Sequence, residues 1–141
     1  MNVTLQILTT DNAGLLQHIA ADVFDDEIVP AQLEAFLADP RHLMILAVDD
    51  GTVVGMASAF EYVHPDKRPQ LFINEVGVAP GYRKQGIGRH LVESLIAQAR
   101  DRGCNYAWLG TDADNVAGQA CFGSVAGVRD PQPFLLYEWE L

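Results

Sequence analysis

A chain of 141 residues with 49% hydrophobic and 20% charged side chains is expected to form one domain over residues 1–141, neither disordered nor fibrous. It shows no basic leader before a long apolar run and no stretch of eighteen apolar residues, so we expect no signal peptide, no membrane partner and a cytoplasmic location. The formal net charge of −10 disfavours nucleic acid as a partner, because phosphates would be repelled, and would attract a small polycation. Solubility alone is the commoner explanation of such a charge.

Hydrophobic periodicity predicts ten elements in the order strand, helix, helix, three strands, helix, strand, helix and strand. Asp50-Gly51 is typical of a tight hairpin turn between two of the strands, and VHPDKRP, residues 63–69, is expected to be a polar loop. An early hairpin combined with helical crossovers predicts an α/β fold with a mixed sheet. The elements are expected at residues 3–8, 12–24, 30–38, 43–49, 52–60, 70–78, 87–102, 105–111, 115–122 and 133–141.

A glycine-rich basic stretch, GYRKQGIGRHL at residues 81–91, follows an expected strand and opens an expected helix. The first amides of a helix lie at the positive end of its dipole, so they suit a phosphate or pyrophosphate. Glycines let such a ligand approach closely, and basic side chains add charge. The candidate ligand-binding residues here are Arg83, Lys84, Gln85, Gly86, Ile87, Gly88 and Arg89.

Two well-known phosphate loops do not fit this stretch. A dinucleotide fingerprint would need a third glycine at Leu91 and an acidic residue near Trp108. A P-loop would need Lys and Ser or Thr after Gly88, where Arg89 and His90 stand instead.

The pattern that does fit is Arg/Gln-x-x-Gly-x-Gly/Ala, present at residues 83–88 after a strand ending in Val-x-Pro. Asn115 begins an Asn-x-x-Ala element in which Gly118 replaces the alanine. With VGVAPGYRKQGIGRHLVESLIAQARDRGC around it, the motif resembles the acetyl-coenzyme A site of the GNAT superfamily of N-acetyltransferases. The resemblance implies the GNAT fold, a twisted mixed sheet splayed at its fourth and fifth strands with helices on both faces. It also implies an enzyme that uses acetyl-coenzyme A and no metal.

The resemblance assigns coenzyme contacts to particular residues. The backbones of Val76, Gly77 and Val78 would bind the pantetheine arm, and the amides of residues 85–89 the pyrophosphate. Asn115 would contact the pantetheine side, and a role as helix cap is an equal alternative. Phe122 stands where many family members carry a tyrosine that protonates the departing thiolate. That proton is therefore unassigned, with direct release, water, Ser124 and Tyr137 as alternatives.

Glu75 is the charged residue of an otherwise apolar strand, LFINEVGV. Partial burial would raise the pKa of its carboxyl and make it a better base, acting through a water. We expect Glu75 to be the catalytic base that deprotonates the acceptor amine. The alternative is that it only binds the substrate ammonium.

Within the superfamily, the chain is most similar to the aminoglycoside 3-N-acetyltransferases, in AADVF before an acidic run, LMILAVDDGTVVG, RKQGIG and Asp112. This implies antibiotic resistance and a carboxylate-lined acceptor site built from Asp25, Asp26, Glu27, Glu75, Asp112 and Glu138. For Asp25, Asp26 and Glu27 taken alone, a solvated turn is the commoner explanation. A polyamine or a peptide amine would satisfy the same charges, and a non-catalytic acyl-coenzyme A module is a further alternative. By analogy, a homodimer could form through PFLLYEWEL, residues 133–141.

Overall fold

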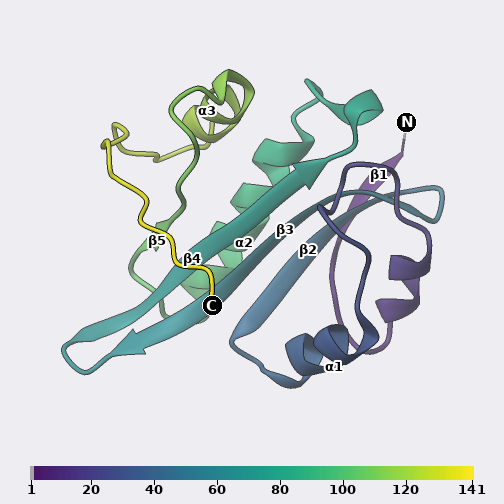
Figure 1. Cartoon of the computed structure of the whole chain (residues 1–141), viewed down its shortest axis with the longest axis horizontal. Helices are drawn as coiled ribbons and strands as arrows, with labels where there is room; N and C mark the ends of the chain where they lie inside the picture. Colours follow the sequence, from purple (N-terminus) through teal and green to yellow (C-terminus); the bar gives the residue numbers. More distant parts are fainter. Residues whose placement is uncertain (1) are drawn as a thin grey trace.

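The computed structural model describes residues 2–141 and is built on one five-stranded sheet in the order β1-β2-β3-β4-β5 (Figure 1). Neighbouring strands are antiparallel from β1 through β4, whereas β5 runs parallel to β4. The expected mixed sheet is therefore confirmed. The strands are β1 (Val3–Ile7), β2 (His42–Asp49), β3 (Thr52–His64), β4 (Lys67–Val78) and β5 (Ala107–Trp108).

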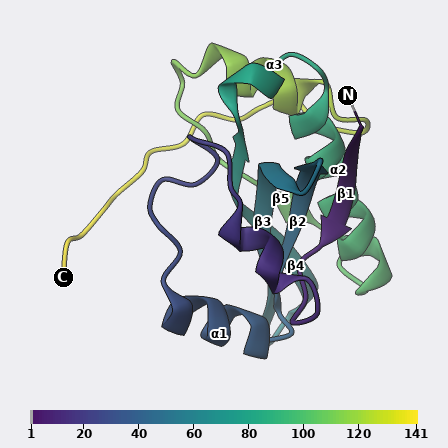
Figure 2. The ribbon, with the colours of Figure 1, turned by 90° about the vertical axis from the view of Figure 1, so that its right-hand side faces the viewer.

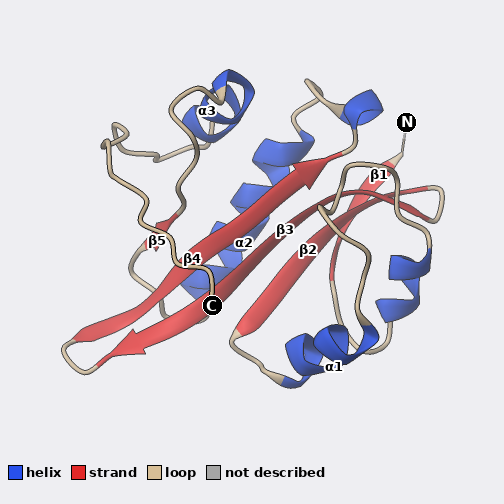
Figure 3. Cartoon of the chain, in the orientation of Figure 1, coloured by secondary structure: helices blue, strands red, loops and turns tan. Residues whose placement is uncertain are grey.

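Helices cover both faces of this sheet, as expected. Figure 2 shows α1 (Pro30–Ala38) and α2 (Ile87–Asp101) on opposite sides of the strands. A third helix, α3 (Val116–Gly123), lies beyond the splayed edge of β4, as Figure 3 shows. Two short 3₁₀ helices, at Ala13–Gln17 and Pro80–Tyr82, complete the regular structure of residues 2–141.

The helix α2 forms where the sequence predicts it, because its apolar residues recur every three or four positions. That stripe is buried against the sheet, with Leu91 and Leu95 fully enclosed. Gly103 follows the helix with a φ of +83°, a left-handed conformation that glycine adopts without strain. Packing of α2 fixes the end of the helix that faces the top of β4.

The splay expected between the fourth and fifth strands is present. β4 pairs with β5 only at Leu71 with Ala107 and at Phe72 with Trp108. Beyond this point residues 73–78 have no strand partner on that side among residues 2–141. The two strands diverge there (Figure 1), so the backbone edge of upper β4 is free to bind a ligand.

An irregularity in β4 decides which face Glu75 occupies. Ser58 of β3 pairs with Glu75, but the next residue, Ala59, pairs with Ile73. Asn74 is thus the extra residue of a β-bulge. Leu71 and Ile73 face the core under α2, and regular alternation would send Glu75 there too. The bulge instead turns Glu75 to the opposite face, toward α1.

The prediction of a helix over residues 12–24 is wrong beyond the first turns. Only the 3₁₀ helix Ala13–Gln17 forms. Ile19 then makes a parallel bridge with Val53, and the Ala20 N–H donates to the Val53 carbonyl at 2.9 Å. Pairing with β3 thus replaces helical hydrogen bonds. Asn12 does not cap a helix, because its Oδ1 accepts the Thr9 N–H at 2.7 Å.

Three strand expectations also need correction. The segment expected as a polar loop is mostly strand, because β3 extends to His64 and β4 begins at Lys67. The strand expected at residues 105–111 shrinks to Ala107–Trp108, since the chain leaves β4 at the splay. The strand expected at residues 133–141 does not form, and these residues are exposed and without regular structure.

Candidate functional site

The start of α2 is an open backbone site for an anion. Gly86 precedes the helix with a φ of +81° and provides no side-chain cap, and Lys84 is also left-handed, at +62°. The first helical hydrogen bond runs from the His90 N–H to the Gly86 carbonyl at 3.0 Å. Within the described helix, the three amides before His90 therefore have no partner. They point outward at the positive end of the helix dipole.

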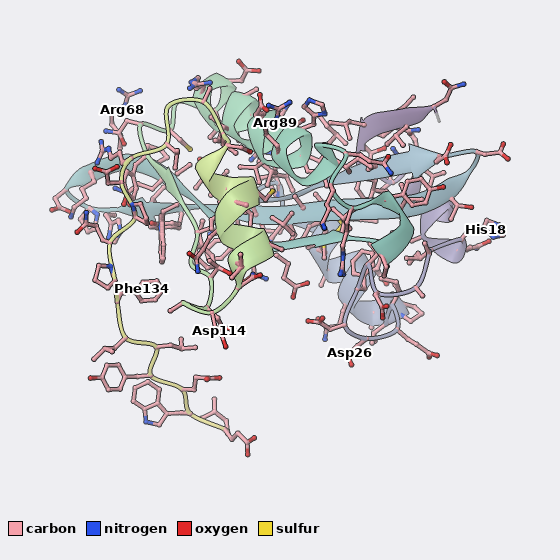
Figure 4. All side chains as sticks on the ribbon, turned by 90° about the horizontal axis from the view of Figure 1, so that it is seen from above. His18, Asp26, Arg68, Arg89, Asp114 and Phe134 are labelled. Atoms are coloured by element: carbon pink, nitrogen blue, oxygen red, sulfur yellow. The ribbon has the colours of Figure 1, made fainter. Side chains whose placement is uncertain are left out.

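Basic side chains surround this helix start, as the sequence predicts. Arg83 folds back so that its Nε donates to the Val78 carbonyl at 3.1 Å. Arg89, labelled on α2 in Figure 4, forms an ion pair with Glu93 at 3.3 Å. These interactions are exposed and weak, so an incoming phosphate can compete for both guanidinium groups.

Gly88 has a different role from Gly86. A Cβ at Gly88 would lie 2.8 Å from the Cys121 Sγ, so the glycine lets α3 approach the start of α2. Burial raises the pKa of the Cys121 thiol. The neighbouring Phe122 is partly buried against the α2 core and, having no hydroxyl, offers no proton.

Asn115 is a helix cap in this structure. Its Oδ1 accepts the Gly118 N–H at 3.0 Å, and its Nδ2 donates to the Thr111 hydroxyl oxygen at 2.8 Å. A Cβ at Gly118 would lie 2.3 Å from the Asn115 Nδ2. The glycine that replaces the usual alanine therefore makes room for this side-chain position. Both ends of the amide group are already hydrogen-bonded.

On the α1 face of the sheet, Glu75 borders a cavity of about 270 Å³. The predicted run of three acidic residues lines the same cavity, and Figure 4 shows Asp26 on this side, away from Arg89. The rest of the lining is almost entirely apolar. The cavity is lined by Leu8, Leu16, Phe24, Asp25, Asp26, Glu27, Ile28, Val29, Gln32, Leu33, Phe36, Met44 and Glu75.

The electrostatics of Glu75 follow from this environment. Although part of its surface stays open to solvent, burial raises the pKa of its carboxyl above the ordinary value. The negative charges of Asp25 and Asp26 raise that pKa further. A carboxylate with a raised pKa holds a proton more strongly, so Glu75 is better suited than an ordinary glutamate to accept one.

Other predicted residues lie elsewhere. Asp112 is exposed in the loop before α3, and the described cavity lining does not include it. Tyr137 and Glu138 belong to the exposed C-terminal segment. The Ser124 hydroxyl donates to the Cys121 carbonyl at the end of α3. The structure thus brings together only part of the predicted acceptor site.

The role of Asn74 is missing from the sequence prediction, although a signal was present. Apolar positions fall at 71 and 73 and then at 76 and 78. A step of three within a period of two is what a bulge produces.

Comparison with known proteins agrees with this geometry. The model of the acetyltransferase (GNAT) family matches residues 8–127. N-alpha-acetyltransferase RimI of Mycobacterium tuberculosis is 32% identical over 137 residues, covering 90% of this chain and 79% of the relative. An uncharacterized N-acetyltransferase of that organism, Rv2669, is 31% identical over 103 residues. These cover 73% of this chain, and the chain spans 63% of that relative's length.

Solved structures share the fold. An aminoglycoside acetyltransferase, meta-AAC0020, from an uncultured soil metagenomic sample superposes with a TM-score of 0.82 at 14% identity, covering 98% of this chain and 96% of that one. AAC(6')-Iy in complex with a bisubstrate analogue superposes with a TM-score of 0.80 at 18% identity over 100% of both chains. The open start of α2, the splay between β4 and β5 and the match to the family model support one conclusion. The chain belongs to the acetyltransferase (GNAT) family.

Proposed function

We propose that this protein is an N-acetyltransferase that moves an acetyl group from acetyl-coenzyme A to a primary amine of a polycationic small molecule, an aminoglycoside acetylated at its 3-N position. One observation carries the proposal. The strand β4 presents Glu75 to a carboxylate-lined cavity and ends at an open helix start that suits a diphosphate. Two functional surfaces thus share one strand.

The residues at the helix start fit the coenzyme. The free amides at the start of α2 would hold the pyrophosphate, while Arg83, Lys84 and Arg89 would balance its charge. The unpaired edge of β4 at residues 76–78 would hydrogen-bond the pantetheine arm like an added strand. Bound acetyl-coenzyme A supplies an activated acetyl thioester.

On the other face, the chain prepares the acceptor. An aminoglycoside carries several ammonium groups, and the carboxylates of Asp25, Asp26 and Glu27 would bind and orient them. The attacking nitrogen must first lose a proton, because an ammonium has no lone pair. Ionised Glu75 would accept that proton, directly or through a water. The loop residue Asp112 would contribute to the wider negative field.

The departing thiolate has no tyrosine to protonate it at position 122, where many family members carry one. With Phe122 there, the thiolate would leave without a donor side chain, directly or with a proton from water. Ser124 already donates its hydroxyl hydrogen to a carbonyl. Loss of a general acid lowers the rate by roughly 10²–10⁴-fold and leaves the other contributions intact.

An acceptor panel tests the substrate. The purified protein is mixed with acetyl-coenzyme A and, in separate reactions, aminoglycosides, polyamines and peptides with free N-termini, and thiol release is followed. We expect the highest kcat/KM with aminoglycosides, and product NMR should locate the acetyl group at 3-N. Acetyl groups at 6'-N would overturn the position alone. Turnover restricted to peptides or polyamines would overturn the aminoglycoside.

A peptide N-terminus is the second candidate, favoured by the similarity to N-alpha-acetyltransferase RimI. Coenzyme binding without transfer to any amine in the panel would instead indicate a non-catalytic acyl-coenzyme A module. The three neighbouring carboxylates in the cavity lining favour a compact polycation over both.

The substitution Glu75→Gln tests the base. It keeps the shape of the side chain but cannot accept the proton, so kcat/KM should fall by roughly 10²–10⁴-fold. The loss should be largest at moderately acidic pH, where free amine is scarce. The control Asp101→Asn changes an exposed carboxylate at the end of α2. An unchanged pH–rate profile for Glu75→Gln would reject Glu75 as base.

We also propose a homodimer in which the C-terminal segments, residues 134–141, are exchanged. Every large apolar residue of this segment is at least 61% exposed. Leu135, Tyr137, Trp139 and Leu141 fall on every second position, so an extended segment would have one wholly apolar face. The other face carries Leu136, Glu138 and Glu140. The segment leaves the sheet on the α1 side (Figures 2 and 4).

A matching surface lies on that same face. Starting beside α1, aromatic rings of Phe60, Phe72 and Trp108 follow one another, with centroids 5.6 and 4.5 Å apart. Trp108 keeps 39% of its surface exposed. Two copies related by a two-fold axis would each cover the aromatic row of the other.

Light scattering on the full chain tests the dimer. We expect twice the monomer mass, and Trp139→Ser should shift the protein toward monomer. The matched control Glu140→Gln, on the opposite face of the segment, should stay dimeric. A monomeric wild-type chain at every accessible concentration would overturn this proposal.

A further inference from the structure

The acidic segment reaches Glu75 by crossing β4 at a glycine. A Cβ placed on Gly77 would lie 2.2 Å from the Val23 carbonyl oxygen. The nearest Val23 atoms to that Cβ are all backbone, so rotation of a side chain could not relieve the overlap. Only glycine lets the crossing segment lie this close to the strand.

Gly77 and Glu75 occupy the same face of β4. They are two residues apart beyond the bulge, and residues at that spacing lie roughly 7 Å apart on one face. The acidic pair Asp25 and Asp26 follows Val23 by two and three residues. The distance between the Val23 backbone and β4 at Gly77 therefore sets how near these two carboxylates come to Glu75.

The crossing is held at Val23 and at the residues just before it. Val23 is only 3% exposed and belongs to the core between the sheet and α1. Just before it, Asp22 adopts a left-handed φ of +66°, and the Ala20 N–H is bonded to the Val53 carbonyl. A segment anchored in this way moves as a unit when one point of it is pushed.

We propose that Gly77 is a positioning residue, which fixes the acidic segment of residues 22–27 over β4 and thereby sets how an acceptor binds beside Glu75. This inference rests on the proposed function. A methyl group at Gly77 would lift the Val23 carbonyl by about 1 Å to reach ordinary van der Waals contact. Asp25 and Asp26 would then move away from Glu75.

Two consequences follow from the charges. The titratable groups that line the cavity with Glu75 are Asp25, Asp26 and Glu27, all acidic. Moving them away weakens the attraction for a cationic acceptor, so its KM rises. Burial is the main cause of the raised pKa of Glu75, and the charges of Asp25 and Asp26 add to it. Moving these charges away weakens their contribution, so the acidic limb of the pH–rate profile moves to lower pH. The open start of α2 is untouched, so the diphosphate of the coenzyme should be held as before.

The first test compares Gly77→Ala with Gly14→Ala. A Cβ at Gly14 would meet no described atom within 4 Å, and Gly14 has no left-handed φ. For Gly77→Ala we expect acceptor kcat/KM to fall by about 10- to 100-fold, in keeping with a 1 Å misplacement, and coenzyme A affinity to change far less. The folded fraction is taken from the stoichiometry of coenzyme A binding. Equal kinetics in the two variants would overturn the proposal.

A second pair of variants changes Asp22, the residue just before Val23, and leaves β4 as it is. Asp22→Ala and Asp22→Asn remove the same charge, but asparagine tolerates a left-handed φ far better than alanine. Asp22→Ala should therefore raise the acceptor KM more than Asp22→Asn does. Equal effects would show that only charge matters at this position and would overturn the anchoring argument.

A readout independent of turnover separates this inference from the proposed function. In ¹³C-labelled protein, NMR titration should give a lower pKa for Glu75 in Gly77→Ala than in the wild type. If wild type acetylates no amine yet this shift appears, the proposed function fails and the positioning role stands. If wild type is active and Glu75 titrates identically in both proteins, the positioning role fails alone.

Discussion

At the scale of single residues, the surroundings of Glu75 affect its strength as a base and the stability of the folded protein in opposite directions. Its surroundings raise the pKa of the carboxyl by burial and by the charges of Asp25 and Asp26. The same surroundings that make it a stronger base make its ionised form costly to the folded protein. A residue that is useful for proton transfer is here a source of instability.

This conflict predicts a pH-dependent effect of Glu75→Gln on stability. Above the ordinary value of 4.5, the folded protein retains a proton that the unfolded chain releases, so stability falls as pH rises through this window. The neutral amide removes that penalty. Thermal unfolding should give Glu75→Gln a higher midpoint than wild type near neutral pH, with the gap closing below 4.5. A gap that is constant across pH would contradict this account.

At the scale of elements, the two ends of α2 show similar glycine geometry with different purposes. Gly86 precedes the helix at a φ of +81° and Gly103 follows it at +83°. Both conformations favour glycine for the same steric reason. Only the first lies beside free amides, whereas the carbonyl of Gly103 accepts a hydrogen bond from the Arg68 guanidinium at 3.0 Å.

The matched pair Gly86→Ala and Gly103→Ala separates these purposes. Each should lower the free energy of unfolding by about 1 kcal/mol, the cost of a left-handed alanine. Gly86→Ala should in addition weaken coenzyme A binding in calorimetry, whereas Gly103→Ala should not. Equal coenzyme affinity in the two variants would argue against a diphosphate site at the start of α2.

At the scale of the whole molecule, a net charge of −10 surrounds one short basic stretch. Long-range attraction draws a polycation toward such a surface, and the acidic cavity concentrates it further. Under the proposed function, the acceptor would be selected first by charge and then by fit.

The dependence of the acceptor KM on salt tests this electrostatic attraction. Raising the ionic strength from low to high shortens the screening length from about 10 Å at 0.1 M to about 3 Å at 1 M, so the KM for a polycationic acceptor should rise several-fold. An acceptor with a single amine serves as control and should respond less. A salt-independent KM for the polycation would show that contact geometry outweighs the field.

Much of the fold was predictable because it depends on local patterns. The apolar stripe of α2, the Asp50-Gly51 turn and the cap at Asn115 each leave a sequence signature that the structure confirms. The helix over residues 12–24 failed because a tertiary bridge between Ile19 and Val53 outcompeted local helix propensity.

The candidate site was predictable only where a motif covers it. Residues 83–89 lie at the start of α2 as the motif implies, and the acidic run meets Glu75 at one cavity. That meeting depends on the bulge at Asn74 and on contact between Gly77 and Val23, which are far apart in sequence. Asp112, placed by family resemblance alone, lies outside the cavity lining.

The two-residue ladder between β4 and β5 has one further consequence. The segment from β5 onward is joined to the antiparallel sheet by pairing with Leu71 and Phe72 and by the Trp108 indole N–H, which donates to the Tyr62 hydroxyl oxygen. Packing of α3 and Val125 on the α2 side adds the remaining contacts. Such a lightly attached unit should open locally without global unfolding, and its amides should exchange hydrogen for deuterium faster than those of β2 and β3. A ligand that bridges the splayed strands would slow this exchange, because it would tie both units into one cooperative body.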